Sequence, residues 1–135
     1  MMNSVLRILA AGFLAGMVMT PALASEDEYQ GDPEKGAKAF AVCRSCHTAD
    51  KGGKNLVGPN LYGIMDRGVA KLEGYSYSAA LKEKAGEEGF TWNEETVSEF
   101  IKNPQAYIKG TQMNVRVPQE KKRKDIIAYL KTLHD

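Results

Sequence analysis

The chain has 135 residues, 43% of them hydrophobic and 26% charged, which is enough for one globular domain and not comfortably for two. Its formal net charge of +1 argues against a nucleic acid as partner, because proteins that bind nucleic acids usually carry a clear basic excess. A domain this small buries a limited fraction of its surface, so a bound group at its centre would help to stabilise it.

The first element along the chain is a predicted export signal. Arg7 is the positive charge of a short leading segment, residues 8–19 are uncharged, and 22–24 (Ala-Leu-Ala) has the small-x-small pattern that signal peptidases cleave after. The uncharged run is shorter than the roughly 20 residues of a membrane-spanning helix, although an uncleaved anchor is the alternative. We predict a signal peptide at 1–24, cleaved after Ala24, a periplasmic location, and a domain at 25–135.

Helix start and stop signals follow, and no convincing alternating strand pattern accompanies them. Asp32 precedes Pro33 and Glu34, as expected where a helix begins with an N-cap and a proline in its first turn. This helix should run from Pro33 into the Cys43 region. The segment 48–69 is rich in Gly, Lys, Asn and Pro, and is predicted to be loop.

The second half of the chain adds one strongly amphipathic helix and shorter ones. Residues 118–133 place Ile126, Tyr129, Leu130 and Leu133 at helical spacing. The other expected helices are a short one at 78–84, one from Asn93 that ends at Asn103 before Pro104, and a single turn at 104–107. The fold class is therefore all-α, with three main helices, one or two short ones, and long loops that would suit a flat cofactor.

The motif that indicates chemistry is C-x-x-C-H at residues 43–47, the pattern of covalent haem attachment. The thiols of Cys43 and Cys46 would add to the two haem vinyl groups, and His47 would bind the iron from one face. A thioredoxin-like redox pair would need a βαβ setting, and zinc would need a second pair of ligands. A disulfide between these neighbouring cysteines would join no distant parts of the chain. We predict one covalently attached haem.

A second axial ligand must come from elsewhere in the chain. The candidates are Met65, Met113 and His134, with lysines as weaker options. Met65 would need a tight fold-back and suits a core position, and His134 stands near the end of the sequence, after the last helix. Met113 follows the loop residues Gly110 and Thr111, far enough from His47 for the chain to reach the other face of the haem. Met113 is the favoured ligand, and a thioether ligand raises the reduction potential.

Several motifs in this order resemble the class I cytochrome c family, including mitochondrial cytochrome c and its soluble bacterial relatives. The resemblance covers residues 31–133, and the motifs stand at 31–36, 43–48, 58–61, 109–113 and 126–130. It implies a class I cytochrome c fold around one haem, in a protein that carries electrons rather than acting as an enzyme.

The resemblance also implies roles for individual residues. The carbonyl of Pro59 would accept a hydrogen bond from the His47 imidazole and orient it. Gly36, Phe40 and Tyr129 match the crossing of the first and last helices. Three residues match groups that hydrogen-bond the haem propionates: Arg67, Tyr77 and Trp92. Plain core burial of Trp92 and a surface position for Arg67 are the alternatives.

The sequence departs from the family pattern near Met113. Phe100 stands where a tyrosine is common, and Leu81 where mitochondrial members often carry an amide. The segment Asn114–Val117 replaces the usual aromatic residue and glycine. These departures concern the tuning of the haem rather than the assignment.

The resemblance suggests membrane complexes as partners of a monomeric respiratory-chain or photosynthetic carrier. The donor would be a cytochrome bc-type quinol reductase, and the acceptor a terminal oxidase, a photosynthetic reaction centre or a peroxidase. A docking face could be formed by lysines 51, 54, 109, 121, 122 and 124. Two alternatives stay open: an enzyme or gas sensor with an open iron position, and a subunit fixed in a larger complex.

Overall fold

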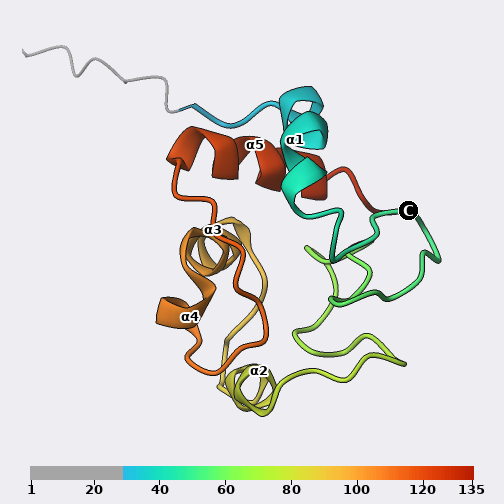
Figure 1. Ribbon diagram of the computed structural model, residues 1–135, viewed down its shortest axis with the longest axis vertical. Helices are drawn as coiled ribbons and strands as arrows, with labels where there is room; N and C mark the ends of the chain where they lie inside the picture. Colours follow the sequence, from blue (N-terminus) through green and yellow to red (C-terminus); the bar gives the residue numbers. More distant parts are fainter. Residues whose placement is uncertain (1–28) are drawn as a thin grey trace, which may run out of the picture.

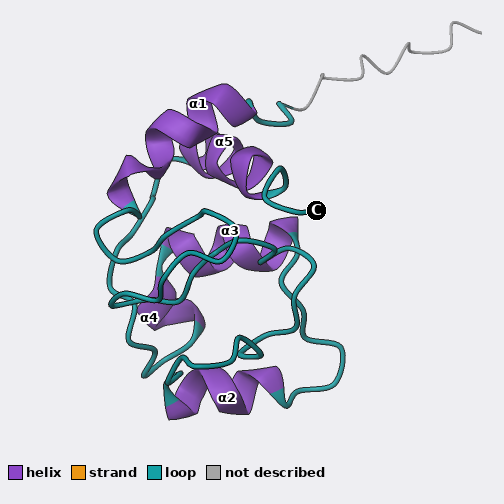
Figure 2. Cartoon of the chain, turned by 90° about the vertical axis from the view of Figure 1, so that its right-hand side faces the viewer, coloured by secondary structure: helices purple, strands orange, loops and turns teal. Residues whose placement is uncertain are grey.

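The computed structural model describes residues 29–135, and all regular structure within this range is helical (Figures 1 and 2). The elements in chain order are α1 (Pro33–Ala39), the 3-10 helix η1 (Phe40–Val42), α2 (Ala79–Ala85), α3 (Glu94–Lys102), α4 (Pro104–Tyr107) and α5 (Glu120–Leu130). The predicted all-α fold is confirmed. The predicted signal peptide lies outside the described residues. None of the described helices combines the length and apolar character needed to cross a membrane.

Side-chain caps explain where the helices begin. The Asp32 carboxylate accepts hydrogen bonds from the first turn of α1, and Ser78 accepts one from the backbone N–H of Leu81 at 3.1 Å. At the start of α3, the side chains of Asn93 and Thr96 each accept a hydrogen bond from the backbone N–H of the other residue. The predicted starts of these helices are therefore confirmed.

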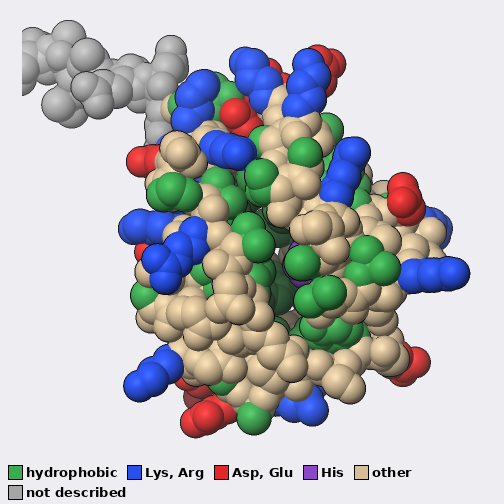
Figure 3. Space-filling model, in the orientation of Figure 1, with side chains coloured by type: hydrophobic (Ala, Val, Ile, Leu, Met, Phe, Trp, Pro, Cys, Tyr) green, Lys and Arg blue, Asp and Glu red, His purple; other side chains and the backbone are tan. Residues whose placement is uncertain are grey.

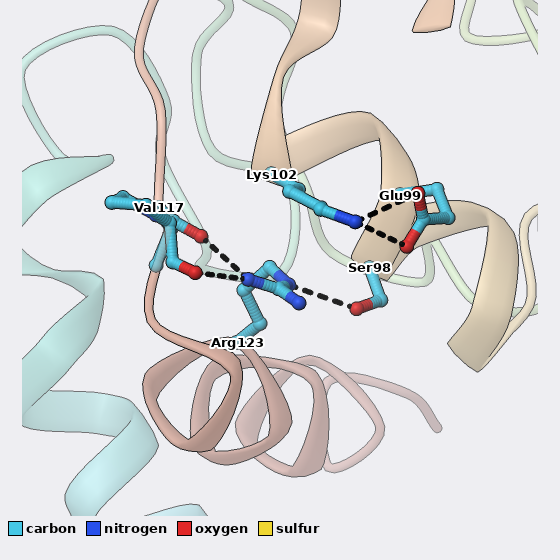
Figure 4. A network of polar contacts seen from close by, with 6 residues as sticks. Ser98, Glu99, Lys102, Val117 and Arg123 are labelled. Atoms are coloured by element: carbon cyan, nitrogen blue, oxygen red, sulfur yellow. Dashed lines mark hydrogen bonds and ion pairs between the residues drawn. The ribbon is translucent and has the colours of Figure 1, made fainter.

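The last helix is shorter than the predicted 118–133, and tertiary hydrogen bonds lie at both ends. Before the helix, the carbonyls of Val117 and Pro118 accept hydrogen bonds from Arg123, which also binds Ser98 on α3 (Figure 4). After it, the Leu133 carbonyl accepts a hydrogen bond from Gly63 N–H at 2.6 Å. The N–H groups of Thr132 and Leu133 donate to carbonyls three residues back, at 2.9 and 3.1 Å, so the α-helical pattern ends before them.

The helices α1 and α5 cross in direct contact, although they lie far apart in the sequence (Figure 2). A Cβ atom at Gly36 would lie 1.9 Å from the Asp125 carbonyl oxygen and 2.8 Å from the Cβ of Tyr129. Only glycine permits this approach. Phe40 is 1% exposed and packs its ring 5.3 Å from that of Tyr129. The predicted crossing of the first and last helices is confirmed.

The remaining elements surround a space beside this helix pair. Helix α3 packs on α5, while α2 lies at the far end of the molecule from α1 (Figure 2). Two long segments close the sides: residues 43–78 after η1, and the Met113 loop, which we define as residues 111–117. The core, built by Phe40, Phe100, Ile126 and Leu130 among others, forms one side of that space.

Candidate cofactor site

A cavity of about 290 Å³ opens between the segment that contains the C-x-x-C-H motif and the Met113 loop. Figure 3 shows the mouth as a hollow with hydrophobic side chains around it and an imidazole visible inside. Its lining is largely apolar and includes Leu61, Leu81, Phe100, Ile126 and Leu130. The cavity therefore suits a largely apolar group that reaches the surface along one edge.

Both cysteines and the adjacent histidine line this cavity. A single turn follows η1, in which the backbone N–H groups of Cys46 and His47 donate to the Cys43 carbonyl at 3.1 and 2.9 Å. This turn brings the two free thiols and the imidazole to one wall. Burial raises the pKa of the Cys43 thiol to about 11, whereas a reactive redox cysteine needs a lowered pKa. The local chemistry does not favour a dithiol redox pair.

The His47 ring is held in one orientation. Its Nδ1 lies 2.7 Å from the Pro59 carbonyl oxygen, which can only accept, so Nδ1 carries the proton and the Nε2 lone pair is left for a metal. Burial lowers the pKa of His47 despite the opposing effect of this hydrogen bond, which keeps the imidazole in its neutral, metal-binding form. A Cβ at Gly58 would lie 2.2 Å from the ring, so glycine is required there.

The loop after the motif is braced by a buried asparagine whose role the sequence analysis did not foresee. Asn60 is 5% exposed, and its side-chain amide donates to Thr48 Oγ1 at 2.7 Å and to the Asp50 carbonyl at 3.0 Å. Its side-chain oxygen accepts from Tyr62 N–H at 3.1 Å. Asn60 follows Gly58 and Pro59 in the sequence motif. Its hydrogen-bond partners could not be predicted from the motif, because they depend on how the loop folds.

Arg67 lies beneath this loop rather than on the cavity wall. Its guanidinium donates to the carbonyls of Asn60 and Tyr62 at 2.9 and 3.0 Å. The Nε atom is buried and has no hydrogen-bond partner among the described residues. One donor is thus left for an acceptor from a bound group, and a role at a propionate stays a prediction.

Tyr77 and Trp92, the other two residues predicted to bind propionates, both line the cavity. The Tyr77 ring packs edge-on against Tyr75, whose hydroxyl donates to the Val57 carbonyl at 2.7 Å. Trp92 is 8% exposed, and its ring packs between those of Phe90 and Phe100. Their contacts to a cofactor remain predictions, although each side chain is in a position to reach one.

Of the three candidate second ligands, Met113 shares a cavity with His47. Met65 and His134 line a separate cleft with Asp66, Glu94 and Lys131. Among the residues that depart from the family pattern, Leu81, Phe100, Asn114 and Val115 line the cavity, whereas Arg116 and Val117 do not. The aromatic position has no hydroxyl to offer the Met113 sulfur.

The residues present fit a covalently attached haem. The cavity offers two thiols, a neutral imidazole with a free Nε2, a glycine cradle at that imidazole, and apolar walls. The Arg67 Nε is a buried donor with no partner in the described part of the chain, although Arg67 does not line the cavity. Fold and site together define a small all-α protein that carries a prosthetic group bound through two sulfur atoms.

Comparison with known proteins identifies the family. The family model for cytochrome c matches residues 33–134. A cytochrome c of Gibberella zeae is 45% identical over 103 residues, covering 75% of this chain and 93% of the relative. Cytochrome c2 iso-1 of Rhodospirillum centenum is 38% identical over 116 residues, covering 76% and 96%. Cytochrome c-550 of Ancylobacter novellus is 41% identical over 103 residues, covering 76% and 95%.

The chain belongs to the cytochrome c family. Members of this family carry covalently attached haem c, and Cys43 and Cys46 are the two cysteines of this chain. The predictions of family, fold and cofactor are therefore confirmed. The protein is a mono-haem electron carrier.

Proposed function

We propose that the protein is an exported carrier that moves single electrons between membrane redox complexes in the periplasm, with His47 and Met113 as the axial ligands of its haem iron. The observation that carries this proposal is the presence of both side chains in the cavity that Cys43 and Cys46 also line. When bound, haem supplies a one-electron ferric–ferrous couple.

The residues of the chain divide the work of such a carrier. Cys43 and Cys46 retain the group covalently, and Pro59 orients His47 through Nδ1. Leu81 and Phe100 keep water from the Met113 side of the cavity, which favours the less charged ferrous state. Two protein ligands leave no open position on the metal, so the protein passes electrons and does not act as an enzyme.

An exposed apolar rim supports electron transfer by contact between proteins. Val57 and Val42, which line the cavity, are 76% and 38% exposed. Of the lysines predicted to form a docking face, Lys51 pairs with Asp135 at 2.6 Å and Lys124 with Glu120 at 3.2 Å. Lys122 lies close enough to Cys43 to lower its pKa against the larger effect of burial. The proposed partners are a quinol–cytochrome reductase as donor and a terminal oxidase, reaction centre or peroxidase as acceptor.

The Met113→Ala holoprotein tests the ligand assignment, with Met65→Ala as the matched control. Loss of the thioether should lower the reduction potential markedly and let carbon monoxide bind the ferrous protein at neutral pH. The control should keep the wild-type spectrum, because Met65 lies outside the cavity. An unchanged spectrum in Met113→Ala would remove this residue from its proposed role.

Location and partners need separate measurements. Mass spectrometry of the protein from the periplasmic fraction should give a chain that begins at Ser25 and carries one haem. Reduction by membranes with quinol reductase activity should slow as salt concentration rises, because salt screens the lysines. Haem-bearing protein confined to the cytoplasm would contradict export.

A further inference from the structure

The Met113 loop is held from outside by a residue that the sequence analysis did not single out. We propose that Gln105 is a positioning residue for Met113: its side-chain amide fastens the Met113 loop to α4 and so slows the release of the methionine from the iron. This inference rests on the proposed role of Met113 as an axial ligand.

The contacts of the Gln105 amide carry the proposal. Its Nε2 lies 2.6 Å from the Thr111 carbonyl oxygen, 3.1 Å from the Met113 carbonyl oxygen and 3.2 Å from Asn114 Oδ1. All three partners are acceptors, so the amide must present its nitrogen to them. One half-buried side chain thus binds the backbone on both sides of Gln112, including that of Met113 itself.

The element that carries Gln105 is a firm anchor. Helix α4 is a single turn, capped by the Asn103 side chain and begun by the buried Pro104. The Ile108 N–H donates to the Pro104 carbonyl at 2.8 Å. A side chain on this turn therefore has a fixed origin from which to hold the loop.

Backbone hydrogen bonds secure the Met113 loop at its two ends. Thr111 N–H donates to the Ile108 carbonyl at 3.1 Å, and Val117 N–H donates to the Ile101 carbonyl at 2.8 Å. Gln105 acts between these ends, at the residue whose sulfur would bind the metal. The Met113 loop must move for the sulfur to leave the metal. The hydrogen bonds from the Gln105 amide to the loop therefore have to break or stretch at that moment.

The test is the rate at which imidazole replaces Met113 in the ferric holoprotein. At saturating imidazole the rate of replacement equals the rate at which the methionine is released. The reaction is monitored by the loss of the charge-transfer absorption of thioether-ligated ferric haem. Gln105→Ala should react about tenfold faster than wild type, as expected when about one net hydrogen-bond contribution is lost. Gln119→Ala is the matched control, because Gln119 precedes α5 and its side chain makes no capping bond.

Gln105→Glu separates hydrogen bonding from packing. Glutamate has nearly the same shape but offers no donor to the three oxygens, so it should react at least as fast as Gln105→Ala. Rates within twofold of wild type in both variants would overturn the proposal, as would a wild-type rate in Gln105→Glu alone. If the wild-type protein itself lacked the thioether absorption, the assignment of Met113 would fail instead.

Discussion

The position of the His47 ring depends on the absence of a side chain at Gly58. The imidazole lies against this glycine, while Nδ1 donates to the carbonyl of the next residue, Pro59. The backbone N–H of Gly58 in turn donates to the Cys46 carbonyl at 2.7 Å. The C-x-x-C-H motif and Gly58 thus form one local unit, in which contact with the backbone at Gly58 and Pro59 fixes the orientation of His47.

Gly58→Ala should disturb this unit in the holoprotein. The added Cβ would lie 2.2 Å from His47 Cε1, so the ring must shift and lengthen its hydrogen bond to Pro59. We expect a loss of about 1–3 kcal/mol in the free energy of unfolding, as for other overpacked sites, and a changed visible spectrum. Gly74→Ala is the control: its Cβ would meet no atom within 4 Å, so it should weaken the fold through its positive φ and leave the spectrum unchanged.

Asp32 makes stability depend on pH at the start of α1. Its carboxylate lies 2.9 Å from the Lys35 ammonium and accepts two backbone N–H bonds. The side-chain hydrogen bond to Lys35, followed by that from the Lys35 backbone, lowers the pKa of Asp32 below its ordinary value of 3.8. The charged form therefore stabilises the fold above the unfolded-state pKa, and this contribution is lost as pH falls through the lowered pKa.

Asp32→Asn should expose that dependence, because asparagine also caps helices but carries no charge. The variant should be less stable than wild type at neutral pH, and the two should converge in acid. Urea midpoints across a series of buffers provide the measurement. A constant difference at every pH would show that the charge of Asp32 contributes nothing.

Individual residues were predictable where the signal is local. The motif at 43–47 and the caps Asp32 and Asn93 act within a few residues, so sequence alone identified them. Ser78, predicted as the first residue of a short helix, is its N-cap instead. Gln105 gave no comparable signal, and Asn60 lay within the 58–61 motif without an assigned role. Each binds acceptors that only the folded loops bring within reach.

At the scale of elements, the predicted helices were confirmed and the end points of α5 were not. Its hydrophobic spacing extends beyond the helix on the C-terminal side, because Leu133 continues the pattern. The structure ends the helix at Leu130, and Leu133 instead bonds the loop at Gly63. Hydrophobic periodicity reports which face is buried, whereas the helix stops where Thr132 and Leu133 donate to carbonyls three residues back.

Arg123 joins three elements and is 5% exposed. Figure 4 shows its guanidinium between Ser98 on α3 and the backbone near Val117, at the end of the Met113 loop. The distances are 3.0 Å from Nε to Ser98 Oγ, and 3.1 and 2.7 Å from Nη1 to the carbonyls of Val117 and Pro118. A buried cation bound to neutral acceptors holds the loop, α3 and α5 together.

Arg123→Ala should therefore destabilise the holoprotein by about 3 kcal/mol, since it leaves buried acceptors without a donor. The exposed Arg116, on the same loop, supplies the control. Its replacement by alanine should change stability by no more than about 0.5 kcal/mol. Chemical denaturation compares the variants, and equal effects of the two substitutions would rule out the structural role given to Arg123.

For the whole molecule, the cavity sets a limit on stability without the haem. Without the haem, the apolar side chains that line this cavity of about 290 Å³ would be exposed to water, which is unfavourable. Small domains have only about 5–15 kcal/mol of total stability. The group that fills the cavity is therefore a large part of what holds the fold.

The double variant Cys43→Ser with Cys46→Ser tests this dependence. Expressed with a competent haem-maturation system, it should yield a colourless chain with little helical signal in far-ultraviolet circular dichroism. The wild-type protein prepared in parallel should be coloured and helical. A stable, cooperative fold in the colourless variant would contradict a core that depends on its cofactor.

The overall arrangement was predictable from the order of motifs, while the shape of the cavity was not. Helices with loops around one haem followed from the caps, the motif and the resemblance. How the residues that differ from the family pattern, such as Phe100 and Asn114, line the wall depends on the folded path of the loops. A loop without regular spacing gives no sequence signal for the direction of its side chains.

The crossing of α1 and α5 has a consequence for biosynthesis. Cys43 follows α1 and η1 directly, whereas the partner of α1, helix α5, stands at the other end of the described chain. Burial in the closed structure raises the pKa of the Cys43 thiol, and the contact of α1 with α5 belongs to that closed structure. Because the haem-free chain is expected not to close this crossing, its sulfur atoms stay open to the attachment machinery, so maturation should precede compaction rather than follow it.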